Sequence, residues 1–138
     1  MRNYSVIIKD DLPQQLFNHL LRKDEQEDLC FATYVPSTGS HRITGILSEI
    51  ILPEGNDRRI HGNVSFMSHY FERALQIAAS KKQGLMFLHS HHAKGWQEMS
   101  EDDLTAESRI APAVYGATNL PMIGLTIGLD GSWSARYW

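Results

Sequence analysis

Cysteine is nearly absent from the sequence, since Cys30 is the only one in 138 residues. A single cysteine cannot form a disulfide within the chain, so nothing indicates an oxidising compartment. No stretch approaches the roughly 20 consecutive apolar residues of a membrane-spanning helix. Residues 1–13 also lack the apolar core of a secretory signal. We therefore expect a cytoplasmic protein without a membrane partner.

Clusters of positive charge are also missing. The formal net charge is −3, and the basic pairs Arg58-Arg59 and Lys81-Lys82 do not extend into longer basic runs. A protein that binds nucleic acid usually presents a basic surface to the phosphates. We therefore expect no nucleic-acid partner.

What remains is an ordinary globular composition, with 42% hydrophobic and 21% charged residues. A chain of this length can bury a full core without a structural metal, so a bound metal would serve function. We expect residues 1–138 to form a single domain. Because the last predicted strand runs to Trp138, a module of a longer protein is an alternative to a complete chain.

Hydrophobic periodicity predicts six strands and three helices. The strands are predicted at residues 4–9, 29–35, 42–52, 84–88, 122–129 and 132–138. The helices are predicted at residues 12–22, 66–81 and 101–108, with N-caps at Asp11, Ser65 and Ser100. Turns or connections are predicted at residues 36–40, 53–57, 112–121 and 130–131. This order predicts a single α/β domain with a mixed sheet.

Two histidines, His89 and His91, come at the end of the predicted strand at residues 84–88. Residues i and i+2 of a strand point to the same side, so both imidazoles can converge on one point. Imidazole is a common ligand of zinc and other divalent transition metals. The alternative is a pair of structural histidines without a metal.

Ser100 and Asp103 begin the third predicted helix. A serine followed three residues later by an acid is an ordinary capping box. The same spacing places both side chains on one face of the first helical turn, where the acid can face the histidines. Two histidines and one carboxylate would leave the fourth position of zinc open for water, as in catalytic sites. An acidic residue would then be the natural general base.

His89-Ser90-His91 followed by Ser100-x-x-Asp103-Leu104 resembles the motif of the JAMM (JAB/MPN) zinc metalloproteases. The resemblance extends over nearly the whole chain, and it implies a partly barrel-like mixed sheet flanked by helices, in a cytidine-deaminase-like arrangement. It implies one zinc ion per chain, held by His89, His91 and Asp103. It further implies that Ser100 steadies the oxyanion and that a glutamate before the second strand, for which we choose Glu27, is the general base.

The sequence departs from the family pattern at two points. The residue after the second histidine is His92, where the family usually has proline. We expect His92 to be a loop residue, or to contact the substrate or a zinc ligand, and not to bind zinc as a third histidine. The loop before Ser100 is one residue longer than the common form, which leaves Asp102 as an alternative to Asp103. Glu25 likewise competes with Glu27 for the role of base.

The resemblance implies a zinc-dependent isopeptidase or peptidase that cleaves an amide bond at the C-terminal tail of a ubiquitin-like protein. Such a substrate makes ubiquitin-activating-like or ubiquitin-conjugating-like (E1/E2-like) proteins possible partners. One alternative is a non-catalytic MPN-type scaffold that binds other proteins. Another is a zinc hydrolase of a small amide or of a sulfur-carrier adduct.

Overall fold

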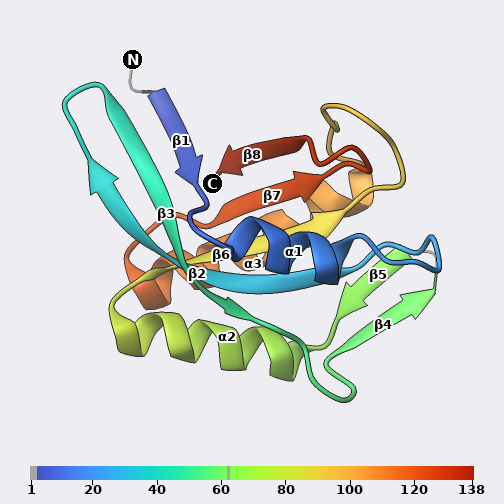
Figure 1. The fold of residues 1–138 in the computed structure, drawn as a ribbon. Coiled ribbons are helices and arrows are strands. Elements are labelled where there is room, and N and C mark those ends of the chain that lie inside the picture. The colour runs from blue at the N-terminus through green and yellow to red at the C-terminus, as the bar shows by residue number, and fades with distance from the viewer. Residues whose placement is uncertain (1–2, 62) are drawn as a thin grey trace.

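A mixed sheet of six strands forms the centre of the computed structural model, which describes residues 3–61 and 63–138 (Figure 1). Its strands, in spatial order, are β1 (Asn3–Ile7), β3 (Arg42–Ile51), β2 (Leu29–Thr38), β6 (Gly84–Ser90), β7 (Ile123–Ile127) and β8 (Trp133–Tyr137). The β1–β3 and β6–β7 pairs are parallel, and the other neighbours are antiparallel. His89 therefore lies at the end of a central strand, and His91 directly follows that strand.

The two edges of the sheet approach each other, so the sheet is nearly closed. The Tyr137 hydroxyl of β8 donates a hydrogen bond of 2.6 Å to the Ser5 carbonyl of β1. The rings of Tyr4 and Tyr137 lie 4.8 Å apart between centroids. These contacts cover part of each edge and limit the unpaired backbone exposed there.

Three helices pack on the sheet: α1 (Leu12–Leu20), α2 (Ser68–Lys81) and α3 (Glu101–Thr118). Successive residues of β2 point to opposite faces. Cys30, Ala32 and Tyr34 pack with Leu16 and Leu20 of α1. Leu29 and Phe31 pack against α2 and α3 on the other face. The predicted α/β domain with a mixed sheet is thus confirmed, and no helix among the described residues is long and apolar enough to cross a bilayer.

The predicted turn at residues 36–40 is partly wrong, because β2 continues through Pro36 to Thr38. The pairing of β2 with β6 covers only residues 29–34, so one side of the strand beyond Tyr34 is an edge. An edge tolerates a proline, which has no N–H to donate. The reversal is confined to the next residues, where the Gly39 N–H donates to the Arg42 carbonyl at 2.7 Å.

A short hairpin, β4 (Arg58–His61) and β5 (Asn63–Phe66), was not predicted, and the N-cap predicted at Ser65 is wrong. Ser65 pairs with Arg59 in the hairpin, and α2 begins at Ser68 after Met67. Asp57 closes the base of the hairpin: its carbonyl accepts the Met67 N–H at 2.7 Å, and its carboxylate accepts the Glu54 N–H at 2.7 Å.

Helix α3 is ten residues longer than the predicted end at Ser108, so the connection predicted at residues 112–121 is also wrong. Pro112 lies inside the helix on its exposed side. A proline there removes one backbone hydrogen bond. Burial of Ile110, Ala111 and Val114 outweighs this loss and carries the helix to Asn119, which ends it in the left-handed conformation.

Candidate metal centre

Strand β6 places His89 and His91 on the same side of the sheet. His89 pairs with Leu29 of β2 and Thr126 of β7, and its side chain is buried. His91 follows the last residue of the strand, but its N–H still donates to the Ile127 carbonyl at 3.0 Å. This bond continues the extended backbone by one residue and keeps the i, i+2 alternation.

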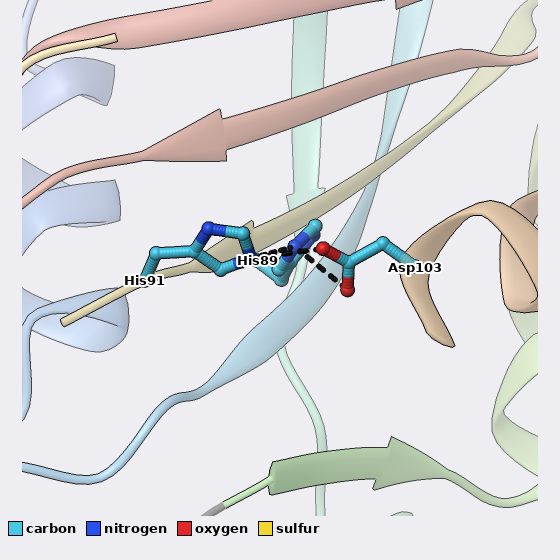
Figure 2. Close-up of side chains that lie close together, drawn as sticks. All are labelled: His89, His91 and Asp103. Atoms are coloured by element: carbon cyan, nitrogen blue, oxygen red, sulfur yellow. Dashed lines mark hydrogen bonds and ion pairs between the residues drawn. The ribbon is translucent and has the colours of Figure 1, made fainter. Parts of the chain in front are cut away.

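Asp103 approaches the two histidines from the first turn of α3, and the three side chains point toward one another (Figure 2). The Nε2 atoms of His89 and His91 lie 3.1 Å apart. Asp103 Oδ1 lies 3.3 Å from His89 Nε2, and Asp103 Oδ2 lies 2.9 Å from His91 Nε2. For zinc bonds of about 2.0–2.1 Å, ligand atoms at the corners of a tetrahedron are about 3.3 Å apart. Each of these three separations, taken to the nearer carboxylate oxygen, is therefore close to that between two tetrahedral ligands.

The capping box at the start of α3 orients this aspartate. The Asp103 N–H donates to Ser100 Oγ at 3.1 Å, and the Ser100 N–H donates to Asp103 Oδ2 at 3.1 Å. The capping role and the approach to the histidines therefore coexist in Asp103. The alternative residue, Asp102, is exposed and lies outside the His-His-Asp group, although it lines the same cavity.

The electrostatics of the group favour a positive charge at its centre. Burial acts to raise the pKa of Asp103, but contacts with His89 and His91 outweigh it and hold the pKa well below its usual value. The hydrogen bond with Asp103 raises the pKa of His91. A carboxylate and two facing imidazole nitrogens need a cation among them, either a proton or a metal ion. Two nitrogens and one oxygen suit zinc or another divalent transition metal.

Glu27 lines the cavity that contains this group, together with Ser100. Burial raises the pKa of Glu27, and the neighbouring His91 and His89 partly offset the effect. Its competitor Glu25 is exposed, is not among the residues that line the cavity, and has a left-handed backbone with φ of 61°. His92 is exposed and lies outside the His-His-Asp group.

Asp28, which the sequence did not single out, fixes the segment that carries Glu27. Its carboxylate is 1% exposed and accepts hydrogen bonds from Arg58 at 2.6 and 3.0 Å and from Arg22 at 3.1 Å. Its N–H donates to Ser90 Oγ at 3.0 Å, and its carbonyl accepts the Ser90 N–H at 3.1 Å. Asp28 thus connects Glu27 to the residue between the two histidines.

A second buried carboxylate, Glu107 of α3, is connected to His89 through Arg136 and Thr126. Glu107 is fully buried and is paired with Arg136 of β8. Arg136 also donates to Thr126 Oγ1 at 3.0 Å, and Thr126 Oγ1 lies 3.5 Å from His89 Nε2. Only the burial of a charged residue on an apolar helix face could have indicated this role, and the helix was predicted to end one residue later.

The cavity beside the group has a volume of about 650 Å³ and opens between the hairpin, α2, α3 and the end of β6. No family model matches the chain, and no curated protein matches it. What the chain does must therefore be inferred from the residues of this site and from their geometry.

Proposed function

We propose that the protein is a zinc-dependent hydrolase of amide bonds, of the JAMM (JAB/MPN) type. The observation that carries the proposal is the convergence of His89, His91 and Asp103 within the distances of a three-ligand site. Three protein ligands leave one position open, which is the arrangement of catalytic zinc. The motif spacing in the sequence supports the same family.

Bound zinc would act as a Lewis acid and lower the pKa of water toward neutrality. In this proposal the Glu27 carboxylate accepts the proton of the attacking water and transfers it to the leaving amine. Ser100 Oγ already accepts the Asp103 N–H, so its own hydroxyl proton is free to donate to the developing oxyanion. Asp28 holds the Glu27 segment against the strand that carries the ligands.

The substrate we propose is the C-terminal tail of a ubiquitin-like protein, joined through an amide bond to a lysine or to a further segment. An extended tail can enter a groove between a hairpin and a helix and pair with exposed backbone. E1/E2-like proteins are then the expected partners. The cavity volume of about 650 Å³ also suits a small amide or a sulfur-carrier adduct, which is the second candidate substrate.

The test of the function is hydrolysis of a ubiquitin-like protein that carries an amide-linked reporter at its C-terminus, measured with zinc present. Glu27→Gln should keep zinc and lose most turnover, by on the order of 10²–10⁴-fold. Glu25→Gln is the matched control and should turn over normally. Full activity of Glu27→Gln would show that another residue is the base. Bound zinc without hydrolysis of tailed proteins or small amides would favour the non-catalytic scaffold.

A further inference from the structure

One exposed arginine, Arg109, lines the cavity and has no partner among residues 3–61 and 63–138. It makes no hydrogen bond or ion pair with any residue that the structure describes, although Glu27, Asp102 and Asp103 line the same cavity. The three carboxylates belong to the end of the cavity that holds the metal group. Arg109 follows Asp103 by six residues on α3, which is about 9 Å along the helix axis.

Much of the remaining lining of the cavity is apolar, although Ser65 and Ser68 also line it. The apolar lining residues are Val64 and Phe66 of the hairpin, Phe71 of α2, Phe87 of β6, and Ala106 and Ile110 of α3. The rings of Phe66 and Phe87 lie 5.5 Å apart between centroids, and those of Phe87 and His89 lie 5.7 Å apart. Aromatic contacts therefore extend from the metal group into the cavity.

We propose that this cavity is a specificity site for an amide substrate with a bulky apolar side chain beside the scissile bond and a carboxylate two to three residues away. The apolar side chain would lie against the phenylalanines, and the carboxylate would pair with Arg109. Two to three residues of extended chain, at about 3.3 Å each, are long enough to span the roughly 9 Å that separates the backbone positions of Asp103 and Arg109 along the axis of α3. The inference rests on the proposed function, because it assumes that an amide is cleaved at the metal group.

The charges of the cavity also orient the substrate. In the zinc-free protein, a substrate carboxylate beside the histidines would meet Glu27 and Asp102, whereas beside Arg109 it meets a guanidinium without a partner among the described residues. The distribution therefore favours one direction of binding and disfavours the other. A tail of small, neutral residues alone would leave both the apolar lining and Arg109 unused.

The test is the binding of short peptides to zinc-free protein, measured by changes in ¹H–¹⁵N chemical shifts. Its outcome therefore depends on neither zinc nor hydrolysis. The probes are acetyl-Phe-Gly-Asp-amide and acetyl-Asp-Gly-Phe-amide, which cover both chain directions. Each is compared with its Asn analogue, which lacks the charge, and with its analogue that has Gly in place of Phe. For at least one of the two residue orders, the Asp peptide should bind about three- to fivefold more tightly than its Asn analogue.

Arg109→Gln should abolish this preference for the charged peptide. Arg42→Gln is the matched control, because it removes an exposed arginine that does not line the cavity, and it should preserve the preference. Ala106→Leu, which fills the cavity, should weaken binding of the Phe peptides and not of the Gly peptides. Equal affinity for Asp and Asn peptides in both directions, or a preference that survives Arg109→Gln, would overturn the proposal. Loss of hydrolysis with these binding results intact would count against the proposed function alone.

Discussion

Two carboxylates near the end of β6, Asp28 and Asp103, differ in the partners that neutralise them. Asp28 is 1% exposed and faces the fixed cations Arg58 and Arg22. Asp103 is 18% exposed and faces two imidazoles, which carry a charge only when protonated. A carboxylate paired with guanidinium groups is already satisfied, whereas one paired with imidazoles can share a metal ion with them. The comparison separates a group that stabilises the fold from one suited to bind a metal.

The largest expected effect is on stability, for substitution of Asp28. Asp28→Asn removes the charge that compensates Arg58, and it should lower the free energy of unfolding by about 3–5 kcal/mol at neutral pH. Chemical denaturation of the zinc-free protein measures this change. Asp24→Asn, which removes the other, exposed carboxylate bound to Arg22, should leave the midpoint unchanged. Equal midpoints for Asp28→Asn and wild type would refute the assignment.

Substitution of Asp103, in contrast, should chiefly affect zinc binding. Asp103→Ala should weaken zinc binding by on the order of 100-fold or more, because one of three ligands is lost. Competition with a zinc chelator measures the affinity. Asp102→Ala is the matched control one residue away and should change the affinity by only a few fold. The reverse ranking would make Asp102 the ligand.

Ser100 has a capping role in the fold and a proposed role in catalysis. Its substitution should affect stability less than substitution of Asp28 does. Ser100→Ala removes the oxygen that accepts the Asp103 N–H and should cost about 1 kcal/mol of unfolding free energy. Ser108→Ala, within the same helix, should cost no more than a few tenths of a kcal/mol. If Ser100 also donates to the oxyanion, its variant should lose on the order of 100-fold in kcat, while Ser108→Ala keeps full turnover. Normal kcat for Ser100→Ala would restrict Ser100 to capping.

The smallest effect is expected in acid, at the base of the hairpin. Hydrogen bonds from Arg73 lower the pKa of Asp57 to about 2, whereas an unfolded aspartate has a pKa of about 3.9. The stabilisation is therefore complete above about pH 4 and is lost as the pH falls toward about 2. Arg73 is 36% exposed, so water screens the pair and its contribution should stay below about 1 kcal/mol.

Acid unfolding of wild type and Asp57→Asn checks this sign in the zinc-free protein. The difference in unfolding free energy between the two should be constant above about pH 4 and should shrink below it. A difference that persists to pH 2 would mean that Asp57 acts through its hydrogen bonds alone and not through its charge.

Much of the fold could be predicted from the sequence because its main strands and helices coincide with short apolar runs, alternating segments, helical repeats or helix caps. The hairpin at residues 58–66 could not, since its strands have four residues each and depend on the pair of Asp57 and Arg73, which are 16 positions apart in the sequence. The length of α3 was also missed, because Pro112 is a strong local signal for an end and burial of Val114 overrides it.

In the candidate site, too, the local patterns could be predicted and the contacts between distant residues could not. The His-x-His spacing and the Ser-x-x-Asp spacing are local, and the group they suggested does come together. The supporting pairs Asp28–Arg58 and Glu107–Arg136 join residues about 30 positions apart, and no local pattern indicates them. Arg109 could not be placed in the cavity while the helix was expected to end before it.

The most direct test of the central claim is the zinc content of protein purified without a histidine tag, measured by elemental analysis beside the His89→Ala/His91→Ala variant. About one zinc per chain in wild type and none in the folded variant is the predicted result. No retained zinc in wild type, even after reconstitution and removal of excess metal, would contradict the metal centre and the catalytic roles of Glu27 and Ser100 with it.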